Sequence, residues 1–182
     1  MSKPRANKRL TALVLQGGGA LGAYEYGVVK ALYEQPGFKP SVVTGVSIGA
    51  FSAAILAGSK GDPVETLGEM WRRFTLPDSL MVPDQIESYF SLFGNSGMYT
   101  FNPRYLVAPF LATSVYDTTP LRNALEEWID VDKLNTAEMR AIVTAVDVQT
   151  GELHAFDNRN SLTIDHVLAS GSLPPGFPMT KV

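Results

Sequence analysis

A serine between two glycines is the first group in the sequence with the pattern of a nucleophile. Gly45-Val46-Ser47-Ile48-Gly49 has the form G-x-S-x-G and lies between a β-branched run and an alanine-rich run. A serine on a strained strand-to-helix turn exposes its hydroxyl, and glycines two positions away on either side leave that turn unobstructed. The helix N-terminus behind it favours the negative charge that develops in acyl transfer. We therefore predict Ser47 as nucleophile and Gly45 and Gly49 as the nucleophile elbow.

A second glycine-rich turn precedes it. Gly17-Gly18-Gly19-Ala20-Leu21-Gly22 satisfies G-x-G-x-x-G, the pattern of a dinucleotide site, which also needs an acid about 20 residues further on. No acid occurs between Glu34 and Asp62, so a nucleotide-binding oxidoreductase is kept only as a minor alternative. The other use of such a turn is to offer backbone N–H groups to an oxyanion beside Ser47.

The base that would activate Ser47 is left open by the residues themselves. A Ser-His-acid triad would draw on His154, in a strand-like alternation, or on His166, in a predicted short helix, and both follow the serine as the α/β-hydrolase order requires. A direct Ser-Asp pair is the other solution. With no cysteine and two histidines without ligand spacing, we expect neither a metal site nor a cofactor.

Composition limits the class of protein. The 182 residues are 45% hydrophobic and 18% charged, which fits one globular domain and excludes disordered or collagen-like chains. A net charge of −3 does not indicate a protein that binds nucleic acid, because such proteins are typically basic. The apolar run 10–15 is shorter than the roughly 7–15 residues of a signal-peptide core. We predict a cytoplasmic protein with possible peripheral contact to membranes, and the sequence leaves export and oligomeric state open.

Strand and helix patterns alternate along the chain. We expect strands at 11–15, 41–46 and 141–146, and helices at 22–34, 50–57, 63–74, 120–129 and 164–169. Asp62 before Pro63 and Thr163 before its helix have the positions of N-terminal caps. Thr119 before Pro120 has the same pattern of a cap followed by proline at the first helical position. Alternating strands and helices predict an α/β protein with a mostly parallel sheet covered on both faces.

Two segments depart from this pattern. Residues 1–9 form a basic N-terminal arm, with four Lys or Arg and no acid. In residues 77–116, eight of the 40 are Phe or Tyr and only four are charged. An aromatic, charge-poor insertion of this kind is either a lid or lipid-facing wall over an active site or a segment packed on its own core.

Taken together, the motifs resemble those of the patatin-like phospholipase family. Besides the two glycine turns, they include Ala169-Ser170-Gly171-Ser172-Leu173-Pro174-Pro175-Gly176-Phe177-Pro178. Thr144-Ala145-Val146-Asp147 and Thr150-Gly151-Glu152 are similar to an internal strand and turn of that family. The resemblance covers residues 10–182, which we take as one acyl hydrolase domain.

The resemblance implies a three-layer α/β/α lipid acyl hydrolase with a Ser-Asp dyad. Ser47 would attack an ester carbonyl of a phospholipid or acylglycerol. Gly17, Gly18 and Gly19 would form the oxyanion loop, and Gly22 would permit close helix packing. Leu21 stands where the family often has Arg or Lys.

The resemblance also implies an acid that the sequence does not contain. The family's aspartate lies in an Asp-Gly-Gly or Asp-Gly-Ala motif beyond the segment 169–178, and the chain has no Asp-Gly dipeptide. Asp147, Asp157 and Asp165 are expected to be turn or surface residues. We therefore expect a domain that is incomplete at its C-terminus and nearly inactive alone. The alternative is a non-catalytic fragment that binds lipid or a partner protein.

Overall fold

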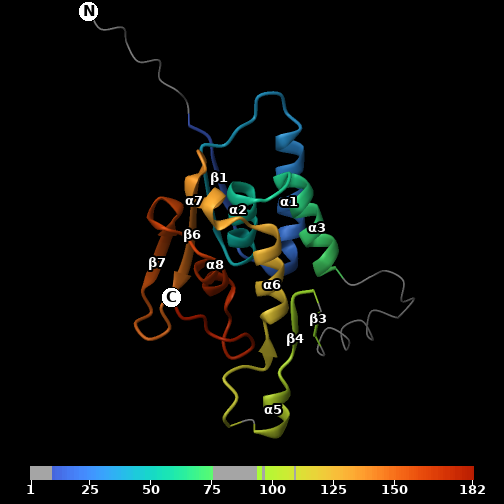
Figure 1. The fold of residues 1–182 in the computed structure, drawn as a ribbon, viewed down its shortest axis with the longest axis vertical. Coiled ribbons are helices and arrows are strands. Elements are labelled where there is room, and N and C mark those ends of the chain that lie inside the picture. Colours follow the sequence, from blue (N-terminus) through green and yellow to red (C-terminus); the bar gives the residue numbers. More distant parts are fainter. Residues whose placement is uncertain (1–9, 76–93, 96, 109) are drawn as a thin grey trace, which may run out of the picture.

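The computed structural model describes residues 10–75, 94–95, 97–108 and 110–182 (Figure 1). The predicted basic arm, residues 1–9, lies outside the described residues. So does the first part of the aromatic stretch, residues 77–93. The second part of that stretch is described and forms a substructure of its own.

The central sheet has four strands in the order β1-β2-β6-β7. β1 (Ala12–Leu15), β2 (Val42–Val46) and β6 (Arg140–Val146) are parallel, and β7 (Leu153–Asp157) pairs antiparallel with β6. The register places Leu15 opposite Gly45 and Gly45 opposite Val143. The carboxyl ends of β1 and β2 therefore meet, and the two glycine-rich turns follow at the same edge of the sheet.

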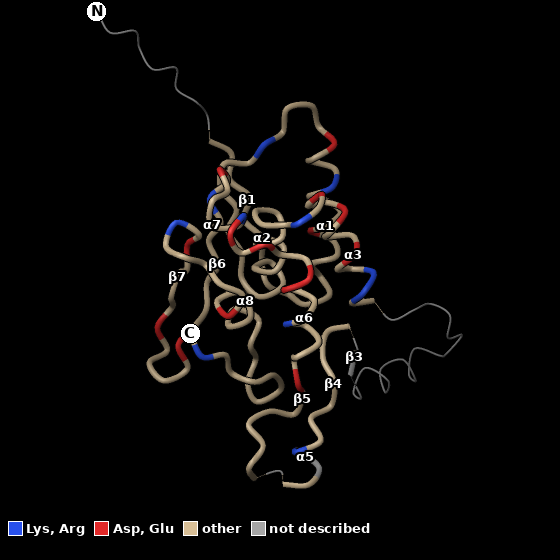
Figure 2. The backbone as a smooth tube through the Cα atoms, in the orientation of Figure 1, with Lys and Arg blue, Asp and Glu red and all other residues tan. Residues whose placement is uncertain are grey.

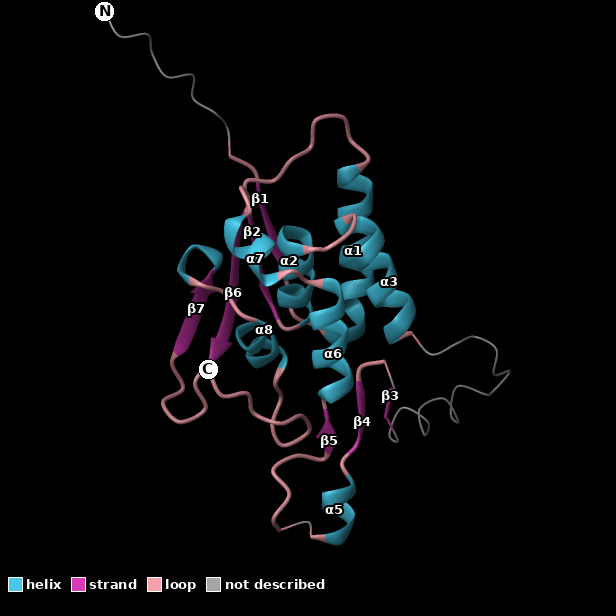
Figure 3. Cartoon of the chain, viewed as in Figure 1, coloured by secondary structure: helices cyan, strands magenta, loops and turns pink. Residues whose placement is uncertain are grey.

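Helices alternate with these strands (Figure 3). They are α1 (Gly22–Tyr33), α2 (Ile48–Gly58), α3 (Pro63–Phe74), α6 (Thr119–Trp128), α7 (Val131–Thr136) and α8 (Ile164–Gly171), with short 3-10 turns η1 (Gly19–Leu21) and η2 (Asn158–Asn160). This mixed, mostly parallel sheet flanked by helices confirms the predicted fold class. In the described residues no helix has the length and apolar character needed to cross a membrane.

Helix α2 forms the centre of the core. Its sequence is apolar on every side, and all of its residues are buried, as expected for a helix enclosed by other elements. It packs on β2 and β6, with α3, α7 and α8 around it. Most of the largest fully buried side chains come from these elements and from α6, and they include Phe51, Ile55, Leu67, Met70, Val143 and Leu125.

The two faces of the sheet differ. Val43, Ala141 and Val143 point to the side of α2 and α8 and are fully buried. The side chains that alternate to the opposite face are more exposed, with Val14 and Val146 as examples. The described helices therefore cover the first face much more completely than the second.

A small second sheet projects from the end toward which β6 runs (Figure 1). It contains β3 (Gly94–Asn95), β4 (Tyr99–Phe101) and β5 (Tyr116–Asp117), all antiparallel, and helix α5 (Pro103–Val107) connects β4 to β5. We call residues 97–117, without 109, the tip hairpin. Strands of two or three residues carry too little periodicity to be predicted from sequence.

Most predicted elements are confirmed. Asp62 accepts hydrogen bonds from the N–H groups of Val64 and Glu65, and Thr163 caps α8 as predicted. Thr119 is not the N-terminal cap that was predicted, because helix α6 already begins at this residue. Asp117 accepts hydrogen bonds from both the N–H and the hydroxyl of Thr119. Helices α5 and α7 were not predicted, since each is shorter than two full turns.

Candidate active site

Ser47 lies on the turn between β2 and α2 with φ 55° and ψ −124°. This positive φ is costly for a residue with a side chain, and such strain is typical of functional turns. Ser47 occupies the N-cap position of α2, yet its hydroxyl makes no capping hydrogen bond. Serine at an N-cap ordinarily accepts from the first turn of its helix. Here the hydroxyl stays available for other chemistry, in the conformation predicted for a nucleophile.

Gly45 and Gly49 allow the turn to close. A Cβ on Gly45 would overlap the backbone of Gly49. A Cβ on Gly49 would overlap the carbonyl of Leu15 at the end of β1. Backbone atoms cannot move aside as a flexible side chain can, so both positions require glycine. The elbow therefore holds β1, β2 and α2 in direct backbone contact.

The glycine-rich turn lies directly beside Ser47. A Cβ on Gly17 would come within 3.3 Å of the Ser47 Cβ. Gly18 and Gly19 have φ of 154° and 56°, a region that favours glycine. Within the described part of the chain, the N–H groups of Gly17 and Gly18 donate no hydrogen bond. Two neighbouring backbone donors without a partner next to a serine could bind an oxyanion.

Gly22 brings three helices together. A Cβ at this position would lie 2.9 Å from the Trp71 ring and 3.0 Å from the Ile48 side chain. The first residue of α1 is thus pressed against α3 and the start of α2. This close packing is what the family resemblance implied for Gly22.

Two supporting residues were missed by the sequence reasoning. The N–H of Ser47 donates to the Ser170 hydroxyl at 2.8 Å, across 123 positions of sequence. The N–H of Gln16 donates to Glu25 Oε1 at 2.7 Å, so a carboxylate fixes the start of the glycine-rich turn. Glu25 lies in the first turn of α1, where an acid is expected for electrostatic reasons alone, and that location was its only available clue.

Neither histidine is bonded to Ser47. His166 completes a capping box on α8, in which its Nδ1 accepts from the Thr163 N–H at 3.0 Å. Its ring also stacks on Phe156, with centroids 4.1 Å apart. Burial lowers the pKa of His166, and the nearby negative charge of Asp165 opposes that effect only partly. His154 lies on β7 opposite Ala145.

The three candidate aspartates have structural partners. Asp147 accepts from the N–H groups of Gln149 and Thr150 and so closes the β6–β7 turn. Asp165 pairs with Arg122 on α6. Asp157 pairs with Arg140, 2.6 Å away. Burial raises the pKa of Asp157, but its hydrogen bonds and the charges of Arg140 and Arg159 outweigh burial and hold that pKa below its usual range. Among the described residues, no carboxylate or imidazole hydrogen-bonds the Ser47 hydroxyl.

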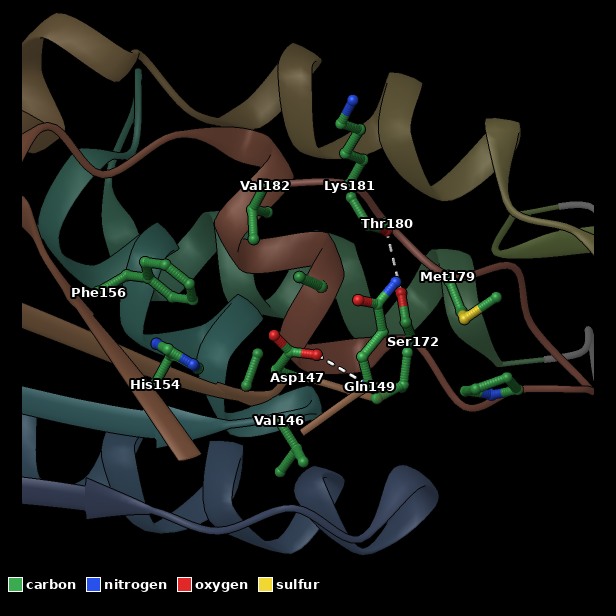
Figure 4. Close-up of a pocket in the computed structure, with 14 residues that line it drawn as sticks. Val146, Asp147, Gln149, His154, Phe156, Ser172, Met179, Thr180, Lys181 and Val182 are labelled. Atoms are coloured by element: carbon green, nitrogen blue, oxygen red, sulfur yellow. Dashed lines mark hydrogen bonds between the residues drawn. The ribbon is translucent and has the colours of Figure 1, made fainter. Parts of the chain in front are cut away.

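A cavity of about 470 Å³ is lined by the ends of β6 and β7, by Ala169 of α8 and by the chain that follows α8. Figure 4 shows Asp147, Gln149 and His154 at its wall, with the chain from Met179 to Val182 opposite. Ser172 lines it and hydrogen-bonds Thr180. Ser47 is not among its lining residues. The structure thus brings Asp147 and His154 to one cavity, whose lining includes Ala169, the residue before the Ser170 that binds the Ser47 N–H.

The family model of Patatin-like phospholipase matches residues 13–182. The chain belongs to this family. Both glycine turns and the segment 169–178 lie inside the matched range, as the resemblance in the sequence implied.

Relatives of the patatin-like domain match over a shorter stretch. A patatin-like phospholipase domain-containing protein of Neurospora crassa is 44% identical over 62 residues, which is 34% of this chain and 7% of that protein. Lysophospholipase nte1 of Aspergillus terreus is 40% identical over 73 residues, 35% of this chain and 5% of that protein. The matched stretch therefore covers less than a tenth of the length of each of these relatives.

Solved structures similar to the patatin-like domain include bacterial proteins. ExoU of Pseudomonas aeruginosa, solved in complex with SpcU, is 22% identical with a TM-score of 0.42, and the match covers 91% of this chain and 36% of that one. VipD of Legionella pneumophila is 18% identical with a TM-score of 0.48, over 92% of this chain and 43% of that one.

Proposed function

We propose that the chain carries the nucleophile and oxyanion site of a serine hydrolase that cleaves fatty-acyl esters of lipids. The observation that carries the proposal is the Ser47 turn: a serine with φ 55° at the start of α2, whose hydroxyl is not used as a cap. Membership in the patatin-like phospholipase family supports a lipid ester as the substrate.

The proposed reaction has two steps. The Ser47 Oγ attacks the ester carbonyl carbon, and the carbonyl oxygen becomes an oxyanion. The N–H groups of Gly17, Gly18 and Gly19 and the N-terminus of α2 stabilise this charge. The alcohol then leaves with a proton, giving an acyl-serine. Water attacks the acyl-serine, releases the fatty acid and restores the Ser47 hydroxyl.

The mechanism needs a base that takes the proton from Ser47. In a Ser-Asp dyad this base is a carboxylate. Asp147, Asp157 and Asp165 are each held by other partners. We therefore assign the base to an aspartate that these 182 residues do not contain, as the family resemblance implies. The 182-residue chain alone is then expected to hydrolyse esters slowly, because a serine without its base loses most of its rate enhancement.

A fluorophosphonate probe followed by peptide mapping tests the proposal. Slow labelling is expected at Ser47 in the wild-type chain and none there in Ser47→Ala. The control is Ser161→Gly, which removes another serine with positive φ, 66°, where glycine is favoured. Labelling at Ser47 should be unchanged in this control.

Two outcomes would contradict parts of the proposal. Rapid labelling of Ser47, with fast ester turnover, would place the base inside the 182-residue chain and overturn its assignment elsewhere. Labelling of Ser47 no faster than of other serines would remove the hydrolase function and favour a module that binds lipid or protein without catalysis.

A further inference from the structure

We propose that the tip hairpin inserts into the surface of a lipid bilayer and brings the Ser47 edge of the sheet against the membrane. Its tip carries three almost fully exposed apolar side chains: Val107 at 87%, Phe110 at 101% and Leu111 at 84%. The inference rests on the proposed action at lipid esters, and names the surface through which such a substrate would be reached.

The base of the hairpin is packed in an aromatic cluster, and the exposed tip differs from it. Tyr99 and Tyr116 meet edge to face with ring centroids 4.8 Å apart, and Phe177 lies 5.2 Å from Tyr99. Phe101 completes this aromatic cluster against Tyr116. Single exposed apolar residues are common in soluble proteins, whereas a group of them on a projecting element marks a contact surface.

The charges of the hairpin indicate the kind of surface that it would contact. Arg104 is the only charged residue between residues 88 and 116. Figure 2 shows the α5 region uncharged apart from one basic position. A segment with apolar side chains, one basic residue and no acid fits the interface of a bilayer that contains anionic headgroups. An acidic neighbour would oppose such contact, and the hairpin has none before Asp117.

The hairpin is connected to the nucleophile by backbone hydrogen bonds. The N–H groups of Val115 and Tyr116 donate to the carbonyls of Pro175 and Gly176, both at 3.0 Å. That segment directly follows α8, whose Ser170 accepts from the Ser47 N–H. Figure 1 places α5 beyond the end toward which β6 runs, which is also the end where β2 leads into Ser47. A membrane that contacts the tip therefore faces the active-site edge.

A single fluorescent label measures insertion directly. The chain has no cysteine, so Phe110→Cys introduces one site for an NBD fluorophore. With vesicles of phosphatidylcholine and phosphatidylserine, we expect a blue shift and an intensity gain of about twofold or more, as NBD leaves water for an apolar interface. The matched control is Leu10→Cys, because Leu10 is also exposed, at 72%, but lies before the opposite end of β1. Its label should show no shift.

Vesicle flotation with the unlabelled chain gives a second measurement. The triple variant Val107→Ser, Phe110→Ser, Leu111→Ser should reduce the membrane-bound fraction at least about fivefold. Its thermal midpoint should stay unchanged, because the side chains are already in water. Arg104→Gln should lose the preference for phosphatidylserine, and Leu10→Ser should bind as the wild type does.

The outcomes separate this inference from the proposed function. An unshifted NBD signal at residue 110, or wild-type flotation by the triple variant, would overturn membrane insertion even where Ser47 is labelled by the fluorophosphonate. A vesicle-independent dimer that the triple variant abolishes would assign the tip to a second copy and also overturn it. Insertion by a Ser47→Ala protein would support the inference whether or not the hydrolase function holds.

Discussion

The Ser47 turn and the tip hairpin are built on opposite principles. At the turn, backbones are so close that two glycines cannot be replaced, and the helix that follows is wholly buried. At the hairpin, short strands are joined to the body through an aromatic cluster, and the apolar end is in water. The comparison shows that the Ser47 turn holds its backbone atoms in a rigid arrangement, while the tip hairpin exposes an apolar surface. The two regions should respond to mutation very differently.

The largest effect is expected from Gly49→Ala. The added methyl group would overlap the carbonyl of Leu15, and separating β1 from α2 would disturb the whole core. We expect a loss of about 4 kcal/mol or more in the free energy of unfolding, measured by urea denaturation. The matched control is Gly27→Ala on α1, where a Cβ meets nothing within 4 Å. It should stabilise by about 0.5–1 kcal/mol. Equal stability of the two variants would contradict the close backbone packing.

The next effect is expected from Asn158→Ala, at the far end of the same core. The Asn158 side chain is buried, donates to the carbonyls of Leu134 and Met139, and accepts from the Ala141 N–H. Its removal leaves three backbone groups in the interior without partners. We expect a loss of about 2–4 kcal/mol by chemical denaturation. A loss close to zero would mean that water replaces the amide.

A smaller and local effect is expected from Phe177→Ala. The ring joins segment 169–178 to the hairpin through Tyr99 and Tyr116. We expect faster amide hydrogen exchange in the hairpin and a global loss of only about 1–2 kcal/mol, because the cluster is peripheral. Exchange in β1 and β2 should stay as in the wild type. If those strands also loosen, the hairpin and the core form one cooperative unit, and the contrast between them fails.

The smallest effect concerns pH. Because burial lowers the pKa of His166 in the folded protein, the unfolded chain takes up its proton first as the pH falls below about 6.5. This contribution to stability is complete above that pH and decreases on acidification. His166→Gln keeps a capping-box residue at the third helical position and removes the titration. The variant should therefore lose less of its thermal midpoint between neutral and mildly acidic pH. An identical pH dependence would contradict the lowered pKa.

Short-range features were predictable because their physics lies within a few residues. Asp62 and Thr163 cap helices whose N–H groups are two or three residues away. The Ser47 turn was predictable because glycines lie two positions before and two positions after the serine. The aromatic stretch 77–116 was left open between a lid and core packing, and its described part contains both a packed cluster and an exposed end. The number of aromatic residues in a segment does not depend on whether they are buried or exposed. Composition therefore could not distinguish the packed cluster from the exposed end.

The sequence by itself determined the alternation of strands and helices, the strained serine and the family. Backbone sterics and local hydrogen bonds decide these features, and residue types at fixed spacing record them. Only the tertiary structure decided that Ser170 holds the Ser47 N–H from 123 positions away, and that His166 serves as a cap. It also decided that Asp147 and His154 line one cavity. Contacts between distant segments depend on how sheet and helices pack, and no local pattern encodes that packing.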